Sequence, residues 1–124
     1  MPSVSATSAS QHEAMEGFEG HYGEVDGYTI AFEQYTEDAD AAAMFVGLPD
    51  DRCQCPHWGH VLRGKIGFRS AAGEETFVAG DAYYVGPGHT PILHAGGAVV
   101  EFSPSDELAQ TMEVVMRNMA AAAG

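Results

Sequence analysis

Basic side chains are scarce in this sequence. It holds 5 Lys and Arg against 18 Asp and Glu, which gives a formal net charge of -13. So large an excess of negative charge repels the phosphates of nucleic acids and of anionic membranes. We therefore expect no nucleic acid and no membrane among the partners.

Long apolar runs are missing as well. No run approaches the roughly 18 to 20 apolar residues that cross a bilayer, and the opening MPSVSATSASQHEAMEG has neither the positive region nor the apolar stretch of a signal peptide. We therefore expect a soluble, cytoplasmic protein. In that reducing compartment the 2 cysteines would be thiols or metal ligands rather than a disulfide.

The length of the chain indicates a single domain. A chain of 124 residues is long enough for one core and too short for two ordinary domains. Residues 1–13 are rich in Ser and Ala and have almost no large apolar side chains, so we expect a disordered tail there. We expect a β-barrel over residues 14–104 and a C-terminal helix in residues 105–124, packed on the barrel or on a partner.

Short segments with alternating β-branched and aromatic residues fill the centre of the chain. They predict strands within residues 28–35, 42–48, 60–70, 75–86 and 91–103. The 15 glycines and 6 prolines separate these segments at the spacing of a small sandwich or barrel. The sequence therefore predicts an all-β core.

After Ser103 the spacing of the apolar residues changes from the alternation of a strand to the period of a helix. This Ser fits an N-cap, Pro104 fits the first helical position, and Asp106 stands three residues after the Ser. The pattern predicts a helix over residues 105–121. Its apolar stripe recurs at spacings of four, three and four residues, at Leu108, Met112, Val115 and Met119.

Side chains that bind metals or react as nucleophiles are concentrated in residues 53–64, CQCPHWGHVLRG. This segment holds both cysteines and the only tryptophan. Thiolates and imidazoles are ligands of zinc and iron. In a regular strand Cys53, Cys55 and His57 would share one face, and Trp58 and His60 the other. The cysteines have alternative roles as small buried hydrophobes, a nucleophile beside a base, or a redox pair, although C-x-C in a strand is weak support for the last.

The spacing of glycines and ligand-type residues resembles the two motifs of the cupins. The first, G-x5-H-x-H-x3or4-E-x6-G, would run from Gly47 to Gly64, and the second, G-x5-P-x-G-x2-H-x3-N, from Gly80 to about Ala95, including GDAYYVGPGH. The resemblance implies a small jelly-roll barrel, the double-stranded β-helix, which often holds a metal and often forms homodimers.

The first motif places the implied ligands. His57 stands seven residues before Gly64, in the position of the motif glutamate. Counted from Gly47, the two motif histidines fall on Cys53 and Cys55; with a connecting loop of normal length they fall on Asp51 and Cys53 instead. The resemblance therefore implies Cys53, Cys55 and His57 as ligands, with Asp51 as the alternative to Cys55.

The second motif departs further, because Pro91 stands where the metal-binding histidine is expected. On a regular strand His89 shares the face of position 91 and His94 lies on the opposite face. We therefore prefer His89 as the fourth ligand. Alternation also means that one of two neighbouring tyrosines faces the cavity, and the expected substrate contacts are Phe68, Tyr83, Tyr84 and His94.

Fold does not select the reaction. We expect a metal-binding protein, with zinc or iron, that acts on a small organic molecule by oxygenase, isomerase or lyase chemistry. The alternative is a non-catalytic module that senses or sequesters a small ligand or a metal. An open coordination position reached by solvent would distinguish the two. The outward Trp58 and His60 further predict a homodimer through barrel strands.

Overall fold

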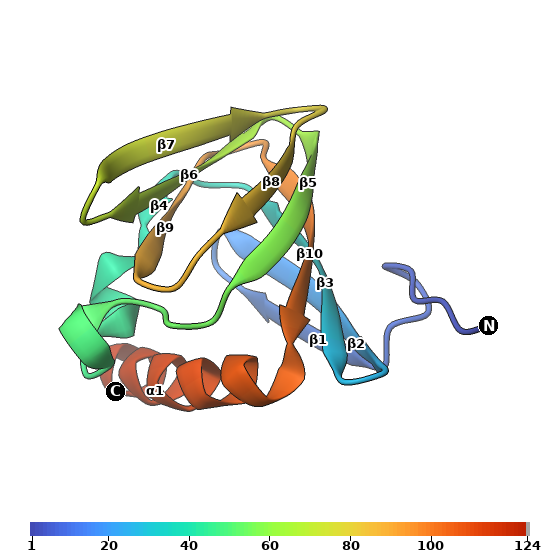
Figure 1. The fold of residues 1–124 in the computed structure, drawn as a ribbon, viewed down its shortest axis with the longest axis horizontal. Helices are drawn as coiled ribbons and strands as arrows, with labels where there is room; N and C mark the ends of the chain where they lie inside the picture. The colour runs from blue at the N-terminus through green and yellow to red at the C-terminus, as the bar shows by residue number, and fades with distance from the viewer. Residues whose placement is uncertain (124) are drawn as a thin grey trace.

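The computed structural model describes residues 1–123 (Figure 1). In these residues ten strands, two short 3-10 helices (η) and one α-helix follow one another. Their order is β1 (Gln11–Met15), β2 (Phe18–Val25), β3 (Tyr28–Tyr35), β4 (Ala39–Asp40), η1 (Ala41–Phe45), η2 (Pro49–Asp51), β5 (His57–Arg63), β6 (Lys65–Ser70), β7 (Gly73–Val78), β8 (Ala82–Val85), β9 (His89–Leu93), β10 (Ala98–Pro104) and α1 (Ser105–Ala123).

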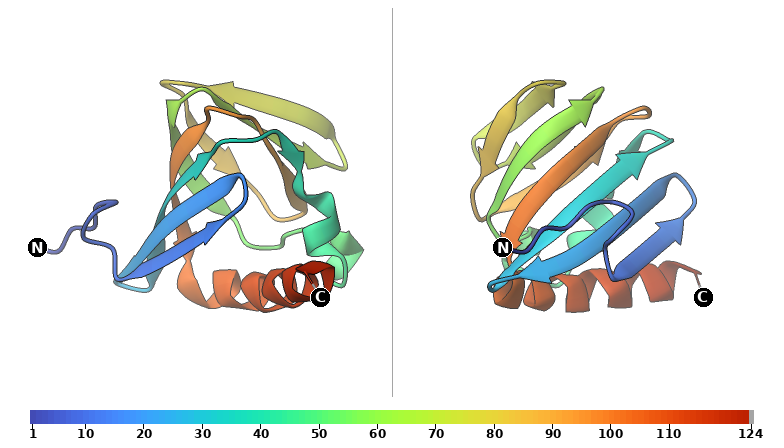
Figure 2. Two further views of the ribbon diagram at one scale, coloured as in Figure 1. Left: turned by 180° about the vertical axis from the view of Figure 1, so that it is seen from behind. Right: turned by 90° about the vertical axis from the view of Figure 1, so that its right-hand side faces the viewer.

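The strands form two antiparallel sheets that face each other as a small barrel (Figures 1 and 2). The six-stranded sheet has the order β1-β2-β3-β10-β5-β8, and the four-stranded sheet the order β4-β9-β6-β7. Helix α1 runs across one end of the barrel in all the views. The predicted all-β barrel with a C-terminal helix is confirmed.

Two apolar clusters fill the molecule. Side chains from both sheets form the first cluster, between the sheets: Tyr35, Val61, Ile66, Phe68, Tyr83, Val85 and Val99. The second lies where α1 meets η1 and the segment before β5, and its buried members are Phe45, Cys53, Cys55 and Val115. The predicted stripe of α1 packs on this second cluster, through Leu108, Met112, Val115 and Met119. The helix therefore covers the segment that carries the cysteines.

The described residues contain no helix that combines the length and the apolar character needed to cross a membrane.

Two local predictions are wrong. Residues 42–48 are not a strand: Ala41–Phe45 form η1, because the Asp40 carboxylate accepts a hydrogen bond of 3.0 Å from the Ala42 N–H and starts a helical turn. Ser103 is not an N-cap either. Strand β10 continues to Pro104, which pairs with Tyr28 of β3, so Ser103 is extended and points into the barrel.

The ends of the chain differ from the expected boundaries in detail. Strand β1 begins at Gln11, so the expected start of the barrel at residue 14 lies inside a strand. The sequence assigned no strand to β1 or β2, because their outward side chains are mostly polar or charged. Helix α1 reaches Ala123, two residues beyond its predicted end, and Gly124 lies outside the described residues.

Candidate functional site

Three side chains with metal-binding atoms meet inside the barrel, beside the end that α1 covers. Cys53 precedes β5, His57 begins β5 and His89 begins β9. The Cys53 N–H donates to the His89 carbonyl at 2.8 Å, and the Gly88 N–H donates to the Cys53 carbonyl at 2.7 Å. Backbone hydrogen bonds thus fasten the Cys53 segment to the start of β9.

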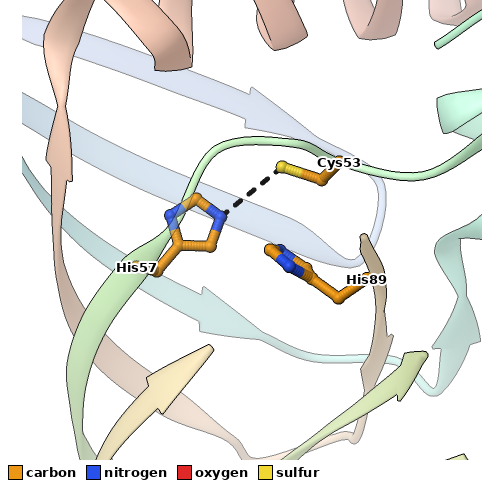
Figure 3. A group of neighbouring side chains, drawn as sticks. All are labelled: Cys53, His57 and His89. Carbon is orange, nitrogen blue, oxygen red and sulfur yellow. Dashed lines mark hydrogen bonds between the residues drawn. The ribbon is translucent and has the colours of Figure 1, made fainter. Parts of the chain in front are cut away.

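The three side chains converge (Figure 3). One donor atom from each lies within 4.8 Å of the others, and Cys53 Sγ is 3.7 Å from His57 Nε2. The two imidazole rings meet edge to face, with 5.0 Å between their centres. All three residues are buried, at 2% exposure for Cys53, 8% for His57 and 2% for His89.

Hydrogen bonds select the free nitrogen of each imidazole. His57 Nδ1 lies 2.7 Å from the hydroxyl of Ser103, and His89 Nδ1 lies 2.6 Å from the carbonyl oxygen of Gly86. An Nδ1–H that donates to these oxygens leaves Nε2 with its lone pair. Metal-binding histidines are commonly oriented by a second partner in this way.

The spacing fits a shared metal ion. For tetrahedral zinc with bonds of about 2.3 Å to sulfur and about 2.0–2.1 Å to nitrogen, the two ligand atoms lie about 3.6 Å apart. Cys53 Sγ and His57 Nε2 are 3.7 Å apart. This pair of donor atoms therefore already has the separation of two ligands on one metal ion, and the His89 donor lies within 4.8 Å of both.

Burial keeps both histidines neutral. It lowers the pKa of His57 to about 4, and with the proximity of His57 it lowers the pKa of His89 to about 4 despite the hydrogen bond to Gly86. Neutral imidazole is the form that binds a metal. Burial also raises the pKa of the Cys53 thiol, so the charge of a cation would be needed to favour the thiolate.

The other two implied ligands lie elsewhere. Cys55 is fully buried, and its Sγ contacts the carbonyl oxygens of Pro56 at 3.4 Å and Pro104 at 3.9 Å, outside the three-residue group. Strand alternation fails here because β5 begins only at His57. Asp51 is exposed, and its carboxylate accepts a hydrogen bond from the Gly47 N–H at 3.0 Å.

The predicted faces of β5 and β8 are found in the structure. Trp58 and His60 point outward. Tyr83 is buried, whereas Tyr84 is exposed and its ring lies 5.0 Å from that of Trp58.

Of the other two residues predicted to contact a substrate, Phe68 lies beside the three-residue group and His94 does not. Phe68 is buried, with its ring centre 5.5 Å from that of His89 and 5.6 Å from that of Tyr83. His94, which follows β9 and is half-buried, does not join the three-residue group. Of the two histidines considered for the site, the structure brings in His89.

A second layer of polar groups escaped the sequence analysis. Tyr83 donates a hydrogen bond of 2.5 Å to Glu101, and Tyr22 and Tyr35 donate to Glu33 at 2.8 and 3.0 Å. Burial raises the pKa of both carboxyl groups, and the charge of Glu101 raises that of Glu33 further. Alternation within β10 is a signal that could have placed Glu101 on the inner face, but the strand pairing that brings these groups together is not local in sequence.

A cavity of about 200 Å³ lies beside the group of Cys53, His57 and His89, where β6 leads into β7 and β8 leads into β9. His89 is part of its wall, with apolar surface from Phe68, Phe77 and Val85. Ser70 and Glu75 add polar groups. A ligand in this cavity would therefore reach the three-residue group from the side of His89.

No family model matches the chain, and no curated protein sequence matches it significantly. Solved structures do resemble it. An RmlC-like cupin from Shewanella frigidimarina superimposes with a TM-score of 0.52 and 14% identity over 76% of this chain and 83% of that one. The chain has the cupin fold.

Two further structures are similar. A cupin-superfamily sugar phosphate isomerase from Silicibacter pomeroyi has a TM-score of 0.53 and 16% identity, over 73% of this chain and 60% of that one. A protein of unknown function from Rhizobium leguminosarum has a TM-score of 0.58 and 16% identity, over 83% of this chain and 94% of that one. At such low identities the comparison shows the cupin fold alone. The function has to be argued from the residues inside the barrel.

Proposed function

We propose that this cupin-fold protein binds one divalent transition metal, zinc or iron, through Cys53 Sγ, His57 Nε2 and His89 Nε2, and acts on a small organic molecule. One observation carries the proposal: the three donor atoms lie within 4.8 Å of one another, while the second nitrogen of each imidazole is already engaged. Thiolate and imidazole favour zinc or iron over magnesium and calcium, which prefer oxygen ligands.

Three protein ligands are the usual number in a catalytic metal site, because the fourth position is then available to water or substrate. A metal bound in this way polarises a carbonyl group or lowers the pKa of a bound water. The residues around it exclude bulk water and fix the ligands. Ser103 and the Gly86 carbonyl orient the rings, and the Phe68 ring packs edge to face against His89.

The cavity supports a small substrate. Its volume of about 200 Å³ is below the roughly 300–1,000 Å³ of pockets for drug-sized ligands. The described residues that line the cavity include no Lys or Arg. Arg69, next to Ser70 in the chain, is paired with Asp40 and Glu74 at 2.7 Å each. Glu75 is the charged residue of the cavity wall. We therefore favour a neutral or weakly charged molecule over a strong anion.

The test is cobalt titration of tag-free protein after the native metal has been stripped. We expect a thiolate-to-cobalt charge-transfer band that saturates at one equivalent in the wild type. The band should be lost in Cys53→Ser and His57→Ala and retained in the matched exposed control His60→Ala. An unchanged band in His57→Ala would contradict the proposed ligand set.

The alternative function is a non-catalytic metal or small-ligand module. The deep burial of the three residues favours it, since Cys53 and His89 are each only 2% exposed. Adding azide to the cobalt protein separates the two functions. A shift of the visible bands shows an exchangeable coordination position and supports catalysis, whereas unchanged bands support a closed site.

A further inference from the structure

A second group of metal-binding side chains lies on the outer face of the six-stranded sheet. His12 of β1 stands directly opposite His21 of β2, and Glu19 lies two residues before His21, on the same face of β2. The two imidazole rings are stacked, with 4.4 Å between their centres and 12° between their planes. This group belongs to the edge of the sheet and shares no residue with the interior site.

Both imidazoles approach the same carboxylate, each through its Nε2 and each at a different oxygen. His12 Nε2 is 3.5 Å from Glu19 Oε2, and His21 Nε2 is 3.3 Å from Glu19 Oε1. Tetrahedral zinc with bonds of about 2.0–2.1 Å places neighbouring ligand atoms about 3.3–3.4 Å apart. One donor from each residue lies within 4.8 Å of the others. Only small side-chain movements would therefore be needed to bind an ion.

Neighbouring strands hold the carboxylate in place. The Gln34 side chain of β3 donates a hydrogen bond of 2.8 Å to Glu19 Oε1, and Arg63 of β5 donates to the side-chain oxygen Oε1 of Gln34 at 3.2 Å. Partners that fix a ligand's orientation raise metal affinity.

We propose that His12, Glu19 and His21 form a second zinc site on the protein surface, with water in the remaining coordination position. The net charge of -13 attracts cations to the surface. Zinc bound here joins the edge strand β1 to β2, and it stabilises the folded chain in proportion to its concentration relative to the dissociation constant. The proposal is independent of the interior site.

Cobalt titration of the tag-free wild type separates the two sites. We expect two equivalents, one with the thiolate charge-transfer band and a second with visible bands but no thiolate band. His12→Ala/His21→Ala should lose the second equivalent, with at least tenfold weaker binding, and keep the first. The matched control is His60→Ala, which removes another exposed histidine from the same outer face.

Zinc calorimetry on Cys53→Ser provides the second measurement. One bound zinc is expected, and it should be lost when His12→Ala/His21→Ala is added. Equal zinc binding with and without His12 and His21 would overturn the proposal, as would a wild type whose only equivalent carries the thiolate band. In both cases the stacked pair with Glu19 would be an ordinary ion-pair cluster. Absence of the thiolate band alone would contradict the interior site and leave this one standing.

Discussion

Single hydrogen bonds decide how the interior residues present their donor atoms. Ser103 and the Gly86 carbonyl both engage Nδ1, so both rings offer Nε2 toward Cys53. Thr111 of α1 lies 3.7 Å from Cys53 Sγ and links the helix to the same thiol. At this scale the site depends on residues that would not themselves touch the metal.

Ser103→Ala tests this dependence. Removal of the hydroxyl leaves His57 Nδ1 without its partner, and loss of such a partner lowers metal affinity about 10- to 100-fold. Zinc calorimetry should show this loss while far-UV circular dichroism stays unchanged. The matched control is Ser105→Ala, because the Ser105 hydroxyl bonds to Thr29 outside the site. Equal affinities in the two variants would contradict the orienting role.

The two cysteines should respond differently to replacement. Cys53→Ser is expected to abolish thiolate coordination. Cys55→Ala is expected to retain the metal and to lower the free energy of unfolding by about 1 kcal/mol, because Cys55 is a buried packing residue. Burial and the neighbouring Cys53 raise the pKa of the Cys55 thiol to about 12, which keeps it protonated. Loss of metal in Cys55→Ala would return this residue to the ligand set.

At the scale of elements, β10 carries the polar interior of the barrel. Glu101 of β10 pairs with Gly59 of β5, and Gly59 pairs on its other side with Tyr83 of β8. The Tyr83 ring lies over Gly59 and reaches Glu101 from there, so a Cβ on Gly59 would overlap the Tyr83 ring. One glycine thus lets a side chain from β8 reach a carboxyl group two strands away.

Gly59→Ala should therefore destabilise the fold. Overpacking in a filled core costs about 1–3 kcal/mol, and urea unfolding should show a loss of that size. Gly86→Ala is the comparison, because its Cβ would make an ordinary contact of 3.6 Å with Tyr84. If Gly59→Ala is as stable as Gly86→Ala, Tyr83 does not occupy this space in solution.

The buried carboxyl groups predict a pH dependence. Burial raises the pKa of Glu101 from 4.5 to about 7, so the folded state holds the proton more tightly than the unfolded chain. This contribution to stability is present below pH 4.5 and is lost as the pH rises to about 7. Relative to the wild type, Glu101→Gln should gain stability through this window, by at most about 1.4 kcal/mol per pH unit for each affected carboxyl group.

Urea midpoints measured between pH 4 and pH 8 check this trend. The trend is read from the difference between variant and wild type, because His57 and His89 change the stability of both proteins in the opposite direction. Their pKa values are lowered, so their contribution to folding stability falls as the pH drops from 6.5 to about 4. The exposed Glu24→Gln is the control and should follow the wild type throughout. A pH-independent difference for Glu101→Gln would contradict the buried, proton-holding carboxyl.

The sequence predicted elements best where one local pattern was enough. Alternation located β3 at residues 28–35 without error, and the 3.6-residue period located the stripe of α1. The prediction failed at Ser103, where pairing with β3 overrode a local capping signal. It also failed at Cys55, because only the fold shows that β5 starts at His57. His89 was found by alternation, whereas the Glu33–Glu101 layer depends on pairing that sequence alone does not show.

At the scale of the whole molecule, a row of apolar side chains crosses the outer face of the six-stranded sheet. Ile30, Phe102, Trp58 and Tyr84 are cross-strand neighbours in turn. Trp58 is 46% exposed, Tyr84 53% and Phe102 40%. An exposed apolar row of this kind is a frequent feature of protein interfaces.

We expect this row to be covered by a second copy of the chain, as the outward Trp58 predicted. Light scattering at micromolar concentration should give a dimer mass for the wild type and a monomer mass for Trp58→Glu. Met116→Glu is the control, because Met116 is an exposed apolar residue on α1, away from the row. A monomeric wild type would rule out the dimer.

The backbone link between Cys53 and His89 has a consequence for how this protein can change over evolution. The two positions are fixed by main-chain hydrogen bonds, which do not depend on which side chain each residue carries. Substitutions there can therefore replace a soft donor with a harder one while the scaffold keeps its shape. For the proposed metal site, this means that one substitution at either position would change the donor set, and with it the preferred metal, without a change of fold.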